Sequence, residues 1–220
     1  KVFIKDGTSI TNCKKTLDGS ALNVSGGEVI MDGGRIAGCT TEEYGGAVYL
    51  NNDASFTLNN GTIENNKTTD DSYSSYGGGA IYVRNALLTI NSGTIQNNSS
   101  NKGGAIYNSS YGTTVINGGT ITNNKAVGDN AHGAAIFHSY RTTSHSEALL
   151  QIGGNANIDA KTNDIYLMNN NSTDKYIEIT SSLKNELLLT VDNAAEGRLI
   201  AKAADGFTLT NNDMAKLSVS

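Results

Sequence analysis

A short glycine-rich motif recurs along the chain and limits what the chain can fold into. Its clearest copy is Gly103-Gly104-Ala105-Ile106-Tyr107, and a Gly-Thr-Ile run follows at residues 119–121. Both pieces return with a base period of about 25 residues, lengthened in places by insertions. A period of this length is typical of a solenoid, in which each repeat forms one coil. Further copies of the first piece, two of them weak, lie at residues 19–23, 44–49, 78–82, 133–137 and 163–166.

The local pattern within each period indicates strands. Runs such as Phe56-Thr57-Leu58 and Leu88-Thr89-Ile90 are rich in β-forming residues and are bounded by Asn and Gly, and no helical periodicity is present. Three such runs per period predict an all-β, right-handed parallel β-helix with three short strands per coil and about six to eight coils. We expect the repeats to occupy residues 1–171. The motif is lost after that, so residues 172–220 are predicted to form the final coils and a β-rich C-terminal cap of the same domain.

Three columns of aliphatic residues predict the core. In a parallel β-helix, equivalent residues of successive coils stack about 4.8 Å apart, so each column of the repeat alignment becomes one row of side chains on one face. The first column is Leu22, Val48, Ile81, Ile106, Ile136 and Ile165. The second is Ile10, Ile36, Ile63, Ile95, Ile121 and Ile158, and the third is Met31, Leu58, Ile90 and Ile116.

An aromatic column follows the first core column by one residue and is therefore predicted to point away from the core. One interpretation is a structural stack that is partly covered by loops. The other is an exposed strip that binds a glycan or a protein partner. The insertions flank the strand that carries this column, and binding residues tend to lie on loops of a rigid scaffold. The candidate binding residues are Tyr49, Tyr82, Tyr107, Phe137 and Tyr166 in the column, with Tyr76 and Tyr140 on the insertions.

Paired asparagines and two cysteines occupy the corner after the Gly-Thr-Ile run. The pairs are residues 65–66, 97–98 and 123–124. Asn tolerates left-handed corners, and stacked amides can hydrogen-bond along the solenoid axis, so we expect a structural role. Cys13 and Cys39 fall in the second Asn column, 26 residues apart, and should be neighbours on adjacent coils. Their expected separation permits a disulfide, but parallel side chains are not ideally aimed at each other, so a bridge and two stacked thiols both remain open.

Charge and titratable residues argue against several classes of function. The net charge is −5 with no basic run, which disfavours nucleic-acid binding, and no apolar segment approaches the length of a membrane span. Polysaccharide lyases and hydrolases built on β-helices need converging carboxylates, and lyases also need an Arg or Lys base. No column here stacks carboxylates with a base, so we expect no catalytic residues, no cofactor and no metal site. Asp70-Asp71 lies on an insertion, and Glu28, Glu64 and Glu147 fall in different columns.

Histidines do not change this expectation. His138 aligns with Leu50, Val83 and Leu167 and is expected to point inward, whereas His132 and His145 are predicted at a corner and in a loop. A metal site needs three or four convergent ligands, and nothing in the spacing brings these three together.

The Gly-Gly-Ala-Ile motif resembles the β-helical surface proteins of bacteria, namely adhesin-like proteins of gut anaerobes and the chlamydial polymorphic outer-membrane proteins. The chlamydial proteins pair this motif with Phe-x-x-Asn, which Phe56-Thr57-Leu58-Asn59 matches and residues 88–91 and 114–117 match loosely. The resemblance implies a non-catalytic adhesin or spacer module, extracellular or on the cell surface, that contacts a glycan or a host protein. The chain begins in mid-pattern, so we expect a fragment of a larger exported protein that does not itself insert into a membrane. The alternative is a pectate-lyase-like enzyme or its inactive carbohydrate-binding relative.

Overall fold

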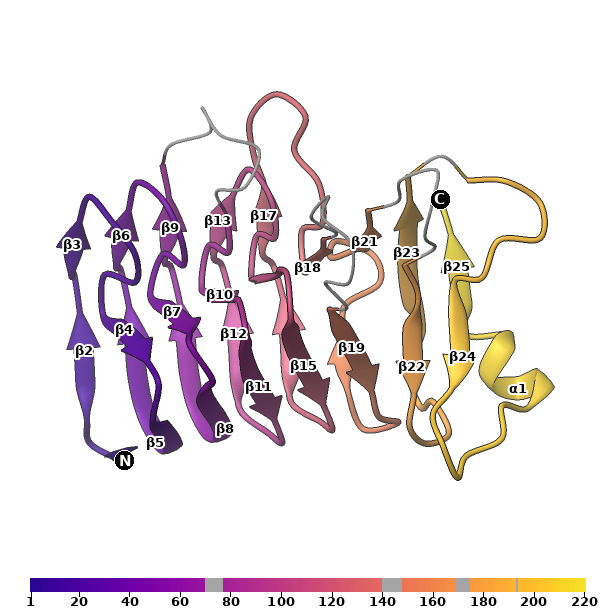
Figure 1. The fold of residues 1–220 in the computed structure, drawn as a ribbon, viewed down its shortest axis with the longest axis horizontal. Coiled ribbons are helices and arrows are strands. Elements are labelled where there is room, and N and C mark those ends of the chain that lie inside the picture. The colour runs from indigo at the N-terminus through magenta and orange to yellow at the C-terminus, as the bar shows by residue number, and fades with distance from the viewer. Residues whose placement is uncertain (70–76, 140–147, 169–174, 193) are drawn as a thin grey trace.

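The computed structural model is an all-β, right-handed parallel solenoid (Figure 1). It describes residues 1–69, 77–139, 148–168, 175–192 and 194–220. Every pair of neighbouring strands in these residues is parallel and joins one coil to the next, in three sheets of 12, 8 and 5 strands. Eight strands in one sheet correspond to about seven turns from first to last, because each turn adds one strand to that sheet. The predicted fold is therefore confirmed.

The 12-stranded sheet, here called the long sheet, contains two rows of strands. The first row is β1 (Val2–Ile4), β5 (Glu28–Ala37), β8 (Ala54–Glu64), β11 (Ala86–Ile90), β15 (Gly112–Ile116), β19 (Leu149–Ile152), β22 (Ile177–Ile179) and β24 (Ala201–Ala203). The second row is β2 (Ser9–Thr11), β12 (Thr94–Gln96), β16 (Thr120–Thr122) and β20 (Asn157–Ile158), and the ends of β5 and β8 extend into it.

The other two sheets complete each coil. The 8-stranded sheet, here called the aromatic sheet, contains β4 (Leu22–Ser25), β7 (Val48–Asn51), β10 (Ile81–Val83), β14 (Ile106–Asn108), β18 (Ile136–His138), β21 (Ile165–Leu167), β23 (Leu187–Val191) and β25 (Leu217–Val219). The 5-stranded sheet contains two-residue strands, β3 (Lys14–Lys15), β6 (Thr40–Thr41), β9 (Lys67–Thr68), β13 (Ser99–Ser100) and β17 (Lys125–Ala126).

Two features of the coil differ from the expectation. The Asn-Gly corner does not separate two sheets, because β8 runs through it from Ala54 to Glu64 and bends at Gly61, whose φ is +104°. The two-residue strands after the Asn pairs were not expected as a sheet. Two residues are too few to show the alternation of inward and outward side chains that marks a strand in a sequence. These strands pair because the neighbouring coils hold them in register.

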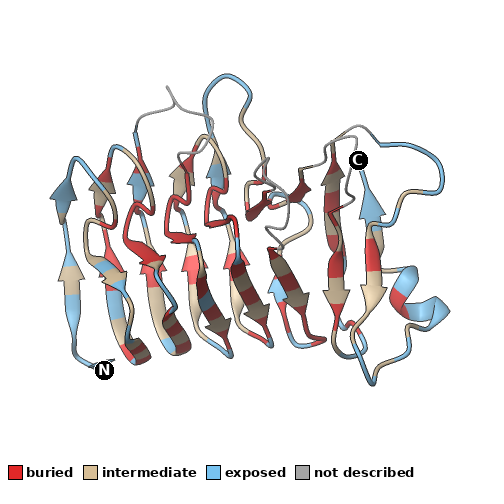
Figure 2. Cartoon of the chain, viewed as in Figure 1, coloured by how far each residue is buried: buried red, intermediate tan, exposed pale blue. Residues whose placement is uncertain are grey.

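The core lies inside the stack of coils, as the three aliphatic columns predict (Figure 2). Ile81 pairs with Val48 and Ile106, and all three side chains are fully buried. Ile63, Ile95 and Ile121 stack in the second column, and Met31 stacks on Leu58 in the third. The exceptions are Ile10 and Leu22 in the first coil, which are only partly buried because that coil has a neighbour on one side.

The two glycines of the repeated motif are needed for different reasons. Gly103 has a φ of +65°, a left-handed conformation that residues with a Cβ resist. Gly104 has no such dihedral, but a Cβ at this position would lie 2.5 Å from the carbonyl oxygen of Ala134 on the next coil. One glycine therefore permits the turn, and the other permits the close approach of successive coils.

The last segments continue the same sheets. β22 and β24 extend the long sheet, while β23 and β25 extend the aromatic sheet. A four-residue helix, α1 (Asn211–Met214), follows β24, and its capping box pairs Thr210 with Asp213. The buried Asp213 carboxylate also accepts a hydrogen bond from the Leu183 backbone N–H (2.8 Å), which fixes this segment to the end of the solenoid. The boundary at residue 171 stays a prediction. None of the described helices has the length and apolar character required to cross a bilayer.

Candidate functional site

The predicted aromatic column forms a continuous stack. Tyr82 lies in register with Tyr49 and Tyr107, and the column continues to Phe137 and Tyr166. Ring centroids of successive members are 4.8 to 5.7 Å apart. All five side chains are at most 7% exposed, and they form a cluster separate from the main core. The stack therefore has the geometry of the structural alternative, and its rings do not present an open flat surface.

A row of backbone explains why the stack is buried. The backbone that leads into the aromatic strands also stacks from coil to coil, at residues 44, 77, 102 and 132. Here we call this row the ledge. Tyr44 packs edge-on against Tyr82 with centroids 4.7 Å apart, and His132 stacks on Tyr166 at 4.3 Å. Gly77 lets the ledge lie close to the aromatic rings, because a Cβ at this position would be 2.5 Å from Cδ2 of Tyr107. The ledge thus covers the outward face of the stack.

The buried tyrosine hydroxyls have partners in the turns that follow the aromatic strands. The Tyr82 hydroxyl donates to Ser109 Oγ at 3.0 Å, and the Tyr107 hydroxyl donates to Ser139 Oγ at 3.1 Å. Burial raises the pKa of Tyr82 well above its usual value, and burial together with Asp192 raises the pKa of Tyr166 to about 12. These phenols stay neutral and hold the turns in place. Tyr76 and Tyr140 lie outside the described residues, and ligand binding by this set of seven residues remains a prediction.

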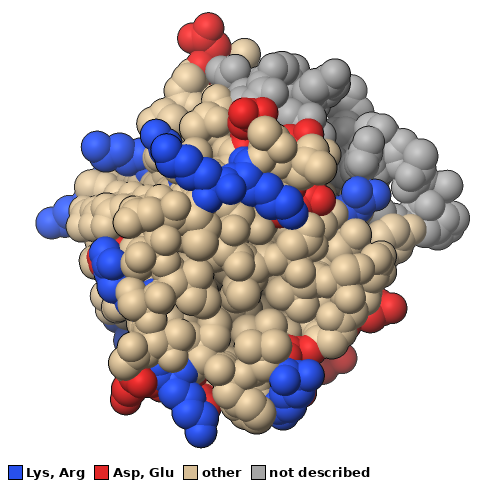
Figure 3. All heavy atoms as spheres, turned by 90° about the vertical axis from the view of Figure 1, so that its left-hand side faces the viewer, with Lys and Arg blue, Asp and Glu red and all other residues tan. Residues whose placement is uncertain are grey.

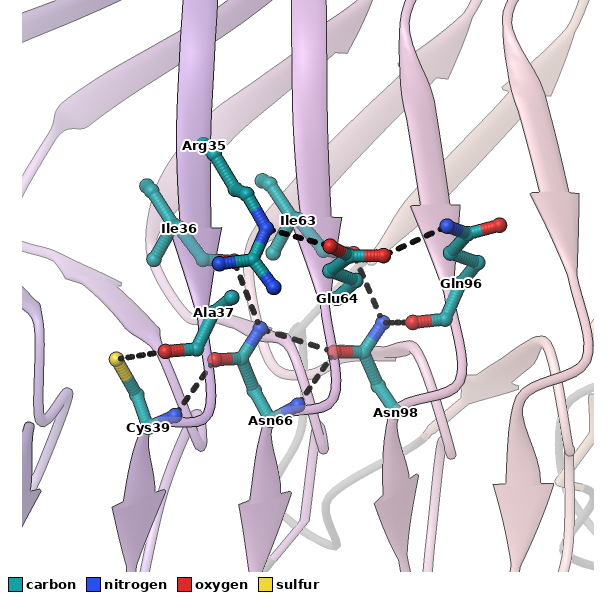
Figure 4. Close-up of polar contacts among 9 residues, drawn as sticks. All are labelled: Arg35, Ile36, Ala37, Cys39, Ile63, Glu64, Asn66, Gln96 and Asn98. Atoms are coloured by element: carbon teal, nitrogen blue, oxygen red, sulfur yellow. Dashed lines mark hydrogen bonds and ion pairs between the residues drawn. The ribbon is translucent and has the colours of Figure 1, made fainter. Parts of the chain in front are cut away.

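The second Asn of each corner pair forms an internal amide ladder, as the sequence predicts (Figure 4), and the ladder continues to Asn163, which is not part of a pair. Asn66, Asn98, Asn124 and Asn163 are at most 2% exposed, and each of the first three donates from Nδ2 to the Oδ1 of the next at 2.9 to 3.2 Å. The first Asn of each pair supplies the corner, with φ near +55° at positions 65, 97 and 123. The ladder satisfies buried polar groups along the axis and holds the register of the coils.

Cys39 takes the place of an asparagine at one end of this ladder. Its backbone N–H donates to Asn66 Oδ1 at 2.9 Å (Figure 4), and its thiol is fully buried. Cys13 lies in the same register on the first coil, where its carbonyl accepts from the Thr40 N–H at 2.8 Å. Both cysteines are free thiols here, and burial raises the pKa of Cys39.

We expect a short thiol–thiol crosslinker to join Cys13 and Cys39 within one reduced molecule, because the register places them on adjacent coils. Peptide mass spectrometry after digestion measures the link. The half-buried Cys13 should react first, and Cys13→Ser should abolish the product. Alkylation of both thiols without any crosslink would show that the register of the first coil is different.

The buried His138 belongs to a polar break in the core. It is 1% exposed and points inward, as its alignment predicts. Asn108 donates from Nδ2 to Leu149 O at 2.9 Å and also lies 3.2 Å from His138 Nδ1. Thr114 Oγ1 donates to Asn108 Oδ1 at 3.1 Å. Burial lowers the pKa of His138 to about 3, and the nearby positive charge of Lys175 acts in the same direction. The imidazole therefore stays neutral in the folded state.

We expect His138 to make the protein less stable in acid. Its folded pKa of about 3 lies below the unfolded value of 6.5, so the unfolded state binds more protons as the pH falls below 6.5. Between pH 7 and pH 4 this linkage lowers the free energy of unfolding by about 3 kcal/mol. Urea unfolding of the wild type and of His138→Leu, which matches Leu167 on the next coil, measures the difference. An equal loss in both proteins would contradict the prediction.

A second column, which the sequence analysis missed, lies at the turn between the aromatic sheet and the long sheet. Asp53, Asn85 and Tyr111 each precede the first paired residue of a long-sheet strand, and Gly26 occupies the equivalent place one coil earlier. All four have left-handed backbones, with φ from +43° to +69°. Gly, Asp and Asn accept this conformation readily, whereas a bulky residue such as Tyr does not. Alignment of these turns by the strands that follow them would have revealed the anomaly at position 111.

Two hollows meet at this corner, and together we call them the corner groove. The hollow on the long-sheet side has a volume of 460 Å³, with Ser55, Leu87 and Thr113 side by side on its floor. The hollow on the other side measures 390 Å³ and is lined in part by Asn52 and Arg84. Asn85 and Tyr111 line both hollows. The Tyr111 side chain is 53% exposed, so the corner groove, unlike the stack, offers an aromatic ring to solvent.

The charged residues considered for catalysis do not converge in the described parts of the chain. Glu64 accepts from Arg35 Nε at 2.5 Å and from Gln96 Nε2 at 2.7 Å, and these bonds hold its pKa below the usual value (Figure 4). Glu28 pairs with Lys1 at 3.0 Å. Asp70, Asp71 and Glu147 lie outside the described residues. Across the described ranges, no three His, Cys, Asp or Glu side chains are placed to hold a metal ion.

Figure 3 views the N-terminal end of the solenoid, where Lys and Arg side chains form a row across the upper part of the face with acidic side chains beside it, and the middle of the face is uncharged. Val2, Phe3 and Leu17 of the first coil are each more than half exposed.

One family of known proteins has repeats that match part of the chain. The model of the Chlamydia polymorphic membrane protein repeat matches residues 60–84 and 92–109. The two matched segments are successive coils, each running from a Gly-Thr-Ile run through an Asn pair and a Gly-Gly-Ala-Ile motif. No curated protein and no solved structure matched significantly. The chain thus resembles, in two of its coils, the repeats of the chlamydial polymorphic membrane proteins.

Proposed function

We propose that the chain is a non-catalytic, adhesin-like module of an exported protein, which presents a rigid contact surface outside the cell. The match of residues 60–84 and 92–109 to a membrane-protein repeat family carries this proposal. Its stacked coils support it, because each coil contacts its neighbours in register and the whole behaves as a stiff rod. Such a rod serves both as a spacer and as a scaffold for a binding face.

The use of charged residues also supports a binding role over a catalytic one. A general acid or base needs a pKa near the working pH, but the bonds from Arg35 and Gln96 keep Glu64 ionised. Lys202 pairs with Glu178 at 2.9 Å and belongs to the same kind of surface ladder. A glycan or a host surface protein is the class of partner that we propose.

The proposal is tested by adhesion and by digestion of polysaccharides. The 220-residue chain, coupled to beads, should adhere to host epithelial cells more strongly than beads coupled to an unrelated β-solenoid. Incubation with polygalacturonate and with other acidic polysaccharides should release no reducing or unsaturated sugars. Absence of adhesion would contradict the adhesin role, and product release would favour the lyase or hydrolase alternative.

A further inference from the structure

We propose that the corner groove binds a neutral oligosaccharide, with the exposed ring of Tyr111 as the stacking platform. The inference rests on the proposed adhesive function and assigns its contact site and ligand class. It moves the contact away from the buried aromatic stack to the adjacent turns.

The backbone of Tyr111 is the first observation that supports this site. Its φ of +56° places a bulky side chain in a conformation that the equivalent turns give to Gly, Asp and Asn. Strain of this kind persists only where the surrounding structure enforces it, and it concentrates at functional sites. The left-handed backbone directs the ring outward, since Tyr111 is 53% exposed while Ser110 and Gly112 on either side are buried.

The turn that carries Tyr111 is held rigidly. The Asn85 N–H donates to Ser110 O at 3.0 Å, the Asp53 N–H donates to Asn85 O at 2.7 Å, and the Gly112 N–H closes the turn onto Ser109 O at 2.8 Å. Ser109 also accepts the hydrogen bond from the Tyr82 hydroxyl. The buried aromatic stack therefore positions the exposed ring, and a preordered platform loses little entropy when a ligand binds.

The chemistry of the corner groove fits a sugar. A flat ring packs against the apolar face of a pyranose, and amide, hydroxyl and carboxylate groups can pair with its hydroxyls. Asn85 lies beside the ring, with Asn52 on one side and Ser55 and Thr113 on the other. Both hollows have volumes in the range of small-ligand sites, and they meet at Tyr111, so an oligomer could place one unit on each side. Asp53 and Arg84, which line the corner groove, carry opposite charges, and this favours a neutral oligosaccharide over a charged one.

A peptide fits the corner groove less well. Peptides commonly add a strand to a free sheet edge, but β11 is paired on both sides, with β8 and with β15. Leu87 is the one large aliphatic side chain among the lining residues, and it is 40% exposed. The lining residues therefore do not form the deep apolar pocket in which a peptide side chain would be anchored.

The test compares Tyr111→Asn with Phe3→Ser. Asn matches the neighbouring left-handed turn at position 85, so the variant should fold as well as the wild type or better. Phe3 has the same exposure as Tyr111 and lies on the first coil, which makes it a matched control. An array of neutral β-linked tetrasaccharides of glucose, galactose and N-acetylglucosamine identifies the probe, and titration calorimetry with that tetrasaccharide measures affinity. Tyr111→Asn should weaken binding about tenfold or more, and Phe3→Ser should not change it.

Three outcomes would overturn the inference. Wild-type affinity in Tyr111→Asn would show that the ring is not the platform. Binding to none of the tetrasaccharides would refute the ligand class. Adhesion to cells that survives enzymatic removal of their glycans would indicate a protein partner. None of these outcomes contradicts the proposed adhesive function, provided that the wild-type protein still adheres to host cells. Absence of adhesion by the wild type would contradict the adhesive function itself.

Discussion

Ile106→Asp should lower the free energy of unfolding by several kcal/mol. Ile106 is fully buried between Ile81 and Ile136 of the adjacent coils, in a core that is one coil wide. The substitution removes a large apolar side chain and leaves a carboxylate without a partner in an apolar column, and both changes are strongly destabilising. The total stability of a domain is only about 5–15 kcal/mol, so the variant should be largely unfolded near room temperature.

Ile106→Val is the matched control, since Val48 already occupies this column. Loss of one methylene should cost about 0.5–1.5 kcal/mol. Circular dichroism during urea unfolding measures both variants. Wild-type unfolding of Ile106→Asp would show that the column does not face the core.

Tyr82→Ser combined with Tyr107→Ser should be nearly as damaging, with a loss of about 5 kcal/mol or more. The two rings are each 3% exposed, and their centroids lie 4.8 Å apart. Their removal leaves a cavity under the ledge and also removes the hydroxyls that bind Ser109 and Ser139. Solenoid stability depends on the contacts between neighbouring coils, and this pair spans one such interface.

The double change of both residues to Phe keeps the rings, as Phe137 does in the same column. It should cost about 1–2 kcal/mol, because the rings stay in place while the hydroxyl hydrogen bonds to Ser109 and Ser139 are lost. Equal unfolding midpoints for the wild type and the Ser variant would mean that the stack contributes nothing to stability.

The sequence predicted the coil well because each coil repeats the same physical constraints. Alternation fixed which residues of Ala105-Ile106-Tyr107 face the core, and the repeat placed them in register with the neighbouring coils. Most of the Asn ladder could be predicted as well, because Asn66, Asn98 and Asn124 each follow another Asn, a residue that accepts a left-handed corner. These features depend on local sequence and on stacking alone.

The burial of the aromatic stack could not be predicted in the same way. Alternation correctly placed Tyr107 away from the core, but it says nothing about what lies over that face. The cover is the ledge, and its fit depends on the missing side chain of Gly77 and on Lys102, whose ammonium lies 5.6 Å from the centre of the Phe137 ring. Such packing between separate segments of a coil is a tertiary property.

The corner groove was missed for a different reason. Tyr111 follows two serines in a polar turn, and its own context indicates only a loop. Its significance appears when Asp53, Asn85 and Tyr111 are placed in one column and their backbones are compared. Alignment of these turns would have shown the unusual residue type at position 111, but that its backbone is left-handed follows only from the structure.

The central claim is that the buried stack supports the fold while the contact surface lies elsewhere on the solenoid. The adhesion of a double variant, in which Tyr82 and Tyr107 are both replaced by Leu, tests this claim most directly. Leucine fills much of the space under the ledge, but both aromatic rings are removed. After circular dichroism has verified folding, bead adhesion to host cells is compared with that of the wild type. The account predicts wild-type adhesion together with a lowered unfolding midpoint. Loss of adhesion in a variant that unfolds like the wild type would contradict it and would place the contact on the aromatic stack.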